Sequence, residues 1–255
     1  MQVVVVGASS GLGRCIGIGL AGRGASVALL ARRRDLLDTA VAEAGPDAFA
    51  AVCDVTDPES CAAAVKESAE ALGGIDALVY APAIGPLARL ADTDVASWRR
   101  VFDTNVTGAS VMTAAALPHL QASAGRAVYL SSVSASQTAP WPGLGAYAVS
   151  KAALDKLVEA WRGEHPEVAF TRLVVGDCMG GEGDGQSQFA TGWDLDLAME
   201  MHGQWTARGL LAGCFIDVEE LIDAVDALLG SGPSLSLSSV TVAPRPLAPE
   251  RQEHR

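Results

Sequence analysis

Residues 3–13 read VVVVGASSGLG, and this stretch decides the fold that we expect. The four valines form a short, β-branched, apolar run, which is typical of a strand buried on both faces in a parallel sheet. A glycine-rich turn follows, and residues 14–21 then read as a helix. Such a turn lets the backbone approach a pyrophosphate, while the helix N-terminus supplies free N–H groups and a positive dipole end. The stretch therefore predicts a phosphate-binding strand–turn–helix unit.

The rest of the chain continues to alternate between strand-like and helix-like segments. The expected strands are 2–6, 26–31, 48–52, 76–80, 126–132, 168–175 and 239–243. The expected helices are 12–22, 34–44, 58–71, 95–121, 145–163, 195–207 and 217–229. This order predicts an α/β fold, a single-domain Rossmann-type doubly wound parallel sheet of about seven strands with helices on both faces. We expect the domain to cover residues 1–243 and a proline-rich, charged tail to cover 244–255.

Charge and composition exclude several classes of partner. The formal net charge is −12, with 18 Lys and Arg against 30 Asp and Glu, which argues against nucleic acid or an anionic membrane as partner. The five cysteines are odd in number and show no Cys-x-x-Cys, so we expect reduced thiols in a cytoplasmic protein. The four histidines are too scattered to suggest a metal site, and the N-terminal apolar run is too short for a signal peptide or a membrane span.

Tyr147 and Lys151 form the most informative pair of polar residues in the chain. The sequence has only three lysines and three tyrosines, and these two lie four residues apart, on one face of an expected helix. An ammonium close to a phenol favours the ionised phenol, and a phenol tuned in this way can pass a proton at neutral pH. The alternative is an ordinary surface Tyr and Lys without a chemical role.

The glycine turn, this pair and their order in the chain resemble the short-chain dehydrogenase/reductase family over nearly the whole sequence. Gly7, Gly11 and Gly13 match the family's Gly-x-x-x-Gly-x-Gly turn. Residues 53–57, Cys-Asp-Val-Thr-Asp, look like its acidic residue after the third strand, which meets the adenine. Residues 129–134, Tyr-Leu-Ser-Ser-Val-Ser, resemble its catalytic-serine strand end.

The resemblance implies an enzyme that transfers hydride between a nicotinamide cofactor and a small carbonyl or alcohol substrate. Tyr147 would exchange the proton, Lys151 would bind the nicotinamide ribose and favour the phenolate, and Ser132 would hold the substrate oxygen. Asn105 would hold a water that links Lys151 to solvent, although a helix kink or cap is the alternative role for this residue. The implied cofactor contacts, besides Tyr147 and Lys151, are Gly7, Ser9, Ser10, Gly11, Leu12, Gly13, Asp54, Val55 and Ala81. The family also implies a homodimer or homotetramer, paired through helices 95–121 and 145–163.

The position of the catalytic serine is open between two residues. Family members usually place it thirteen residues before the tyrosine, which is the position of Ser134, whereas Ser132 lies fifteen before Tyr147. The strand-end pattern favours Ser132, because loops absorb insertions more easily than strand ends do and the loop 137–143 can hold two additional residues. We therefore expect Ser132 to be the substrate-orienting serine.

The end of the second strand indicates which nicotinamide cofactor binds. A fold that prefers NAD usually carries a carboxylate there to hold the ribose diol, and Ala31 stands at this position. Arg32 and Arg33 follow directly, and a planar guanidinium suits the 2′-phosphate of NADP. Cations also oppose the dipole at a helix N-terminus, so the run needs another explanation. We expect NADP(H) to be preferred, with Arg32 as the first phosphate contact and Arg33 as the second.

The sequence departs from the family at three positions. Val6 replaces the usual threonine, and residues 80–83, Tyr-Ala-Pro-Ala, replace Asn-Asn-Ala-Gly, so both sides of one hydrogen-bonded tie are lost together. Gly176 and Asp177 stand where the family shows Pro-Gly. These departures motivate an alternative function, a cofactor-binding regulatory or scaffold protein that has lost turnover.

Residues 177–213 are expected to form a lid over the substrate. The segment offers apolar candidates for the pocket wall, of which any one can instead pack the lid to the body: Phe189, Trp193, Leu195, Leu197, Met199, Met201 and Trp205.

Overall fold

A computed structural model describes residues 1–181 and 186–245 of the chain. Residues 182–185 of the predicted lid and residues 246–255 of the predicted tail lie outside the described residues. In the described part, no helix is long and apolar enough to cross a membrane.

Seven parallel strands form one sheet in the described residues, which confirms the predicted fold class. Their order across the sheet is β3-β2-β1-β4-β5-β6-β7. Their bounds are β1 Gln2–Val6, β2 Ser26–Ala31, β3 Ala48–Val52, β4 Ala77–Tyr80, β5 Arg126–Ser132, β6 Ala169–Val175 and β7 Ser239–Val242. The strand order reverses between β1 and β4, and open sheets of this kind bind ligands outside the carboxyl ends of the strands at such a point.

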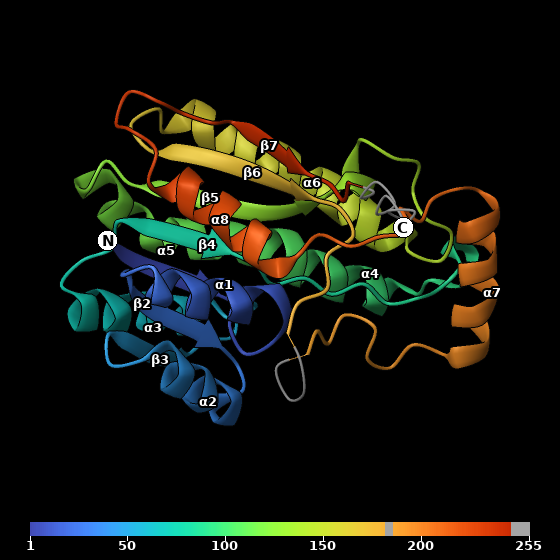
Figure 1. Ribbon diagram of the computed structural model, residues 1–255, viewed down its shortest axis with the longest axis horizontal. Helices are drawn as coiled ribbons and strands as arrows, with labels where there is room; N and C mark the ends of the chain where they lie inside the picture. The colour runs from blue at the N-terminus through green and yellow to red at the C-terminus, as the bar shows by residue number, and fades with distance from the viewer. Residues whose placement is uncertain (182–185, 246–255) are drawn as a thin grey trace, which may run out of the picture.

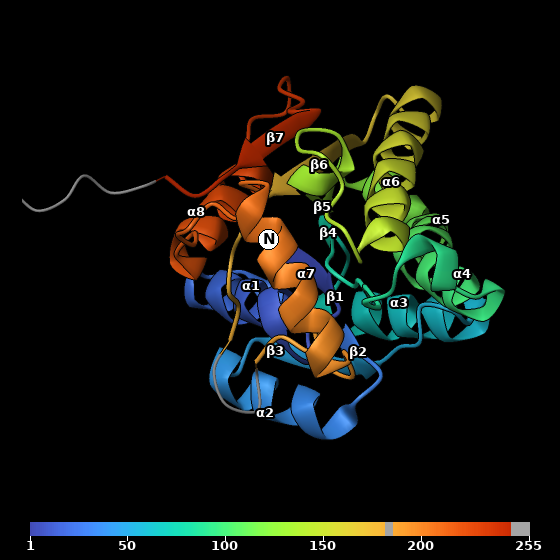
Figure 2. The ribbon, with the colours of Figure 1, turned by 90° about the vertical axis from the view of Figure 1, so that its right-hand side faces the viewer.

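Helices cover both faces of the sheet (Figures 1 and 2). One face carries α1 Gly11–Gly22, α2 Arg34–Ala44 and α8 Val218–Leu229. The other carries α3 Pro58–Leu72, α5 Gly108–Ala122 and α6 Gly145–Glu164. Helix α4, Val95–Phe102, precedes α5 and also contacts α6. Helix α7, Leu195–Ala207, lies apart from both layers at the end of the molecule (Figure 1).

The first strand shows why two cores form. Val3 and Val5 pack into the core beneath α1, α2 and α8, while Val4 and Val6 pack into the core on the opposite face. Successive side chains of a strand point to opposite faces, so an uninterrupted valine run is what a strand between two layers requires. All four valines are at most 1% exposed.

The predicted helix over 95–121 is interrupted by a π-helical turn, Asp103–Thr107, between α4 and α5. The amide of Gly108 donates to the Asp103 carbonyl, five residues back, instead of to the Thr104 carbonyl. The buried Tyr80 hydroxyl donates to Thr104 O at 2.6 Å. A side chain from the sheet thus takes the acceptor that a regular α-helix would have offered to Gly108, and such insertions are a recognised cause of π-bulges.

Candidate active site

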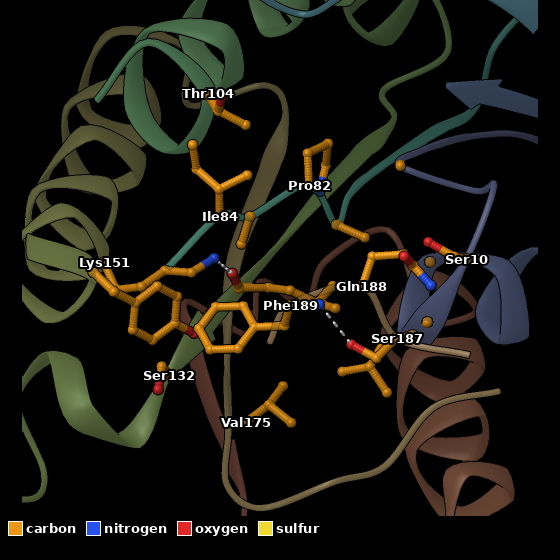
Figure 3. A pocket seen from close by; sticks show the side chains of 18 of the residues that line it. Ser10, Pro82, Ile84, Thr104, Ser132, Lys151, Val175, Ser187, Gln188 and Phe189 are labelled. Carbon is orange, nitrogen blue, oxygen red and sulfur yellow. Dashed lines mark hydrogen bonds between the residues drawn. The ribbon is translucent and has the colours of Figure 1, made fainter. Parts of the chain in front are cut away.

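A cavity of about 600 Å³ opens at the carboxyl ends of the strands. Its lining contains the glycine turn, the end of β2, the end of β5 and the start of α6. Of the predicted site residues, those that line it are Gly7, Ser9, Ser10, Gly11, Leu12, Gly13, Arg32, Arg33, Asp54, Val55, Ala81, Ser132, Tyr147 and Lys151. Asn105 is the predicted site residue outside this lining. Figure 3 shows Ser132, Lys151 and Phe189 grouped in one region and Ser10, Ser187 and Gln188 in another.

The glycine turn leaves its backbone open to the cavity. Gly7 and Gly11 have φ values of +80° and +59°, which L side chains rarely adopt. A Cβ on Gly13 would lie 2.4 Å from the Gly7 carbonyl oxygen, so only glycine lets the start of α1 pack this closely. The Ser10 N-cap makes no side-chain cap hydrogen bond. A helix start whose N–H groups are not taken by the N-cap side chain fits a pyrophosphate.

Arg33 is the arginine that reaches the glycine turn. Its Nη2 donates to Ser9 Oγ at 2.9 Å and to Ser10 Oγ at 2.7 Å. Arg32 instead lies near Asp54, whose pKa is lowered mainly by the Thr56 amide and hydroxyl and further by the Arg32 charge. One guanidinium and two hydroxyls therefore meet beside the turn, and this set of donors suits a phosphate.

Ser132 ends β5 and stands beside the Tyr147 phenol. Its Oγ accepts from the Ser134 amide at 3.2 Å and lies 2.9 Å from Ser134 Oγ. Burial raises the pKa of Tyr147, and the Ser132 hydroxyl acts in the opposite direction. Ser134 also lines the cavity, and its hydroxyl contacts the Ser132 hydroxyl. The geometry gives Ser132 the position next to the phenol.

Lys151 is buried beneath Tyr147, on the next turn of α6. Its Nζ lies 5.8 Å from the centre of the Tyr147 ring and donates to Leu130 O at 2.5 Å. Burial lowers the pKa of Lys151 to about 8, against the opposing effect of the Asp155 charge. A pKa of about 8 leaves most of this amine charged at pH 7 and brings its titration close to neutral pH, which suits a group at a site of proton transfer.

Asn105 sits in the π-helical turn and joins three parts of the structure. Its Nδ2 donates to Ile84 O and to Ser150 Oγ, both at 2.9 Å, and its Oδ1 accepts from Ile84 N at 2.9 Å. The side chain is fully buried. Asn105 therefore links the segment that follows β4 to helix α6. Its role in a water relay stays a prediction.

The segment predicted to be the lid brings the aromatic side chain of Phe189 into the cavity lining. Phe189 meets the Tyr147 ring edge-on, with 4.9 Å between ring centres. Trp193 Nε1 donates to Gly85 O at 2.9 Å, and Trp205 Nε1 donates to Pro142 O at 2.8 Å. Trp193 and Trp205 do not line the cavity, so their hydrogen bonds tie this segment to the body, and Phe189 contributes the apolar surface beside the phenol.

Two of the candidates for this wall point outward. Leu195 and Met199 are 78% and 68% exposed, whereas Met201 and Trp205 are buried against the body. On α7, positions 201 and 205 lie one turn apart and share a face, and positions 195 and 199 lie on another. Of the two alternatives for these candidates, lining the pocket or packing the lid to the body, the structure shows neither for Leu195 and Met199.

Other residues in the site were not foreseen from the sequence. Trp141 and Leu144 line the cavity from the loop before α6, and nothing in their local sequence marks them. Asp155, which acts on Lys151, could have been found from its spacing, because it follows Lys151 by four residues on the same helix. In the part of the chain that the structure describes, no group of three or more His, Cys, Asp or Glu side chains could hold a metal ion.

Comparison with known proteins agrees with this geometry. A family model described as short chain dehydrogenase matches residues 1–176. An 11-beta-hydroxysteroid dehydrogenase A from Sesamum indicum is 34% identical over 180 residues, which are 68% of this chain and 51% of that protein. The chain spans about half the length of the plant relatives that it matches.

Solved structures with the same fold carry different nicotinamide cofactors. A short chain dehydrogenase from Burkholderia cenocepacia J2315, in complex with NADP, has a TM-score of 0.79 and 26% identity, covering 95% of this chain and 96% of that one. A 3-ketoacyl-(acyl-carrier-protein) reductase from Brucella melitensis, complexed with NADH, has a TM-score of 0.79 over 94% of this chain and 96% of that one. At 20% identity the second likeness shows the fold alone.

Proposed function

This chain belongs to the short-chain dehydrogenase family, and from that premise we propose that it is an oxidoreductase that uses NADP(H) on a carbonyl or alcohol substrate. The observation that carries the proposal is one cavity with two chemically different ends. A glycine turn suited to a pyrophosphate lies at one end, and Ser132, Tyr147 and Lys151 meet at the other. When bound, the nicotinamide supplies or accepts the hydride.

The side chains of this protein supply the proton and hold the substrate oxygen. In the reducing direction, the Tyr147 hydroxyl donates its proton to the carbonyl oxygen, and the Ser132 hydroxyl donates a hydrogen bond to the same oxygen. The positive charge of Lys151 favours the phenolate that remains. Holding the reacting groups in this arrangement lowers the entropic part of the barrier. Phe189 and the lid exclude water from the phenol, which strengthens these electrostatic effects.

The preference for NADP(H) rests on charge at the end of β2. Ala31 ends this strand, where an NAD-specific site would carry a carboxylate. Arg33 lies against Ser9 and Ser10, and Arg32 lines the same cavity. A dianionic 2′-phosphate brought to this position gains charge-assisted hydrogen bonds, whereas an uncharged ribose hydroxyl gains little. On the structure we place Arg33 before Arg32 as the phosphate contact.

Oxidation of NADPH with a panel of aldehydes, ketones and quinones tests the proposal. We expect turnover with at least one class, and a loss of roughly 10²–10⁴-fold in the Tyr147→Phe protein, because the general acid is removed. The variant should still bind NADPH, with only the small loss of affinity expected from removing one hydroxyl contact to the cofactor. Tight NADPH binding without turnover of any compound would instead favour the cofactor-binding protein that the departures from the family suggested.

A further inference from the structure

A buried carboxylate lies on α6 below the two groups proposed for proton transfer. Tyr147, Lys151 and Asp155 are spaced four residues apart, so they follow one face of the helix. Asp155 is 5% exposed and does not line the cavity. An acidic side chain is rarely buried unless a charged or polar partner requires it there.

The hydrogen bonding of Asp155 is incomplete. Its Oδ2 lies 3.9 Å from Arg172 Nη1, and that guanidinium is closer to Glu159, at 3.0 Å. Its Oδ1 and the Ser131 Oγ are both buried without a hydrogen-bond partner among the described residues. Burial raises the pKa of Asp155, and the nearby Ser131 hydroxyl and the charges of Arg172 and Lys151 act in the opposite direction. Arg172 alone therefore does not account for the burial of this charge.

Lys151 is a second charged side chain buried on the same face of α6. It is 2% exposed, and one backbone carbonyl, Leu130 O, accepts its hydrogen bond. A carbonyl dipole does not replace the hydration of an ammonium, so a buried lysine tends to become neutral. Asp155 is the charged side chain that counteracts this tendency.

We propose that Asp155 is a positioning residue for the reaction, whose carboxylate, one turn further along the buried face of α6, keeps the Lys151 ammonium charged beneath Tyr147. The inference rests on the proposed function, and Asp155 itself touches neither substrate nor cofactor. Its carboxylate and Ser131 form a polar floor below Lys151, continued to the surface by Arg172 and Glu159.

Other charged groups around α6 do not take this place. On the packed strands, β5 offers Leu130 O and the Ser131 hydroxyl, and β6 offers Arg172. The charged residue of β5, Arg126, instead donates to the carbonyls of Leu229 and Gly232. The 3-10 helical turn at residues 133–135 offers only the Ser134 hydroxyl. The remaining charged side chains on α4 and the π-helical turn, which also pack against α6, are exposed: Arg99, Arg100 and Asp103.

The chain makes a direct test practical because it has only three lysines, at 66, 151 and 156. Protein grown with ¹³Cε-labelled lysine gives three signals, and a Lys151→Met protein identifies the one from Lys151. We expect the Lys151 titration to move down by about one pH unit in Asp155→Asn, because a nearby opposite charge is lost.

Glu159→Gln is the matched control. Glu159 pairs with Lys156 and Arg172, so its loss removes a neighbouring carboxylate from α6 and should leave the Lys151 titration in place. A Lys151 titration that is unchanged in Asp155→Asn would overturn the proposal. If the Asn variant does not fold, Asp155→Ser gives the same reading, since it removes the charge with a smaller side chain.

The pH profile of turnover links the titration to the reaction. In NADPH-dependent reduction, the alkaline limb of kcat for Asp155→Asn should move to lower pH by the same amount as the Lys151 signal. A purely structural Asp155 would lower the melting temperature and leave this limb in place, which would contradict the inference. A shifted Lys151 signal in a protein that turns over no substrate would support the pairing and overturn the proposed function alone.

Discussion

Arg33 should decide between the two nicotinamide cofactors. Its guanidinium donates to Ser9 and Ser10 at 2.9 and 2.7 Å, at the edge of the cavity beside the glycine turn. Replacement by alanine removes this charge and leaves the backbone of the turn in place. We expect Arg33→Ala to weaken NADPH binding and to leave NADH binding nearly unchanged.

The expected loss of NADPH affinity follows from the hydrogen bonds that Arg33 makes before and after a phosphate binds. Hydrogen bonds that involve a charged group contribute about 1.5–3 kcal/mol each, but Arg33 already makes two to hydroxyls before any phosphate arrives. The side chain is also exposed, where ionic interactions are weakened by solvent. We therefore take about 1.5–2 kcal/mol as the net loss, which corresponds to roughly 10–30-fold in the Kd for NADPH.

Calorimetric titration of each protein with NADPH and with NADH gives the ratio of the two Kd values. Arg34→Ala is the matched control, because Arg34 is the next residue and pairs with Asp38 on the exposed side of α2. An equal loss of affinity for both cofactors in Arg33→Ala would mean that Arg33 only supports the turn. A ratio that changes in Arg32→Ala but not in Arg33→Ala would refute the order that we infer from the structure.

Three further outcomes are expected at the same site. Ser132→Ala should lower kcat about 100-fold through loss of a hydrogen bond to the substrate oxygen, and Ser134→Ala should lower it only a few-fold; the reverse order would assign the role to Ser134. Gly13→Ala should weaken NADPH binding at least about tenfold and lower the melting temperature, because its Cβ would lie 2.4 Å from Gly7 O. The folded-state pKa of Lys151, about 8, is below its ordinary 10.5. Between these two pH values the unfolded chain therefore binds more protons than the folded chain. In urea titrations, the unfolding free energy of the wild type should thus rise by about 2–3 kcal/mol relative to Lys151→Met between pH 7 and 10.

The sheet could be predicted from the sequence because its strands are short apolar runs between turns. The run at residues 3–6 and the segment 195–207 lie where the structure has β1 and α7. The π-helical turn within 95–121 could not be predicted, since it depends on the Tyr80 hydroxyl from a strand distant in the sequence. Local periodicity carries no signal for such a contact.

In the candidate site, too, some features could be predicted from the sequence and others could not. Tyr147, Lys151 and Ser132 were expected in one site because a spaced motif and a strand end bring them there. The contact of Arg33 with Ser9 and the edge-on packing of Phe189 against Tyr147 depend on how separate segments meet. Sequence reasoning could name Arg33 and Phe189 as candidates, but only the packed structure gives their partners.

The departures from the family pattern are connected in space. Val6 pairs with Tyr80 across β1 and β4, and Pro82 packs so close to Gly7 that a Cβ there would lie 2.9 Å from the proline nitrogen. Tyr80, where the family carries its first asparagine, is fully buried and bonds to Thr104 O. This bond fixes the π-helical turn that holds Asn105, and Asn105 in turn bonds to Ser150 next to Lys151. The loss of one polar tie has therefore been offset by another that reaches the same helix, which explains how the reacting groups can stay in place although the motif around them has changed.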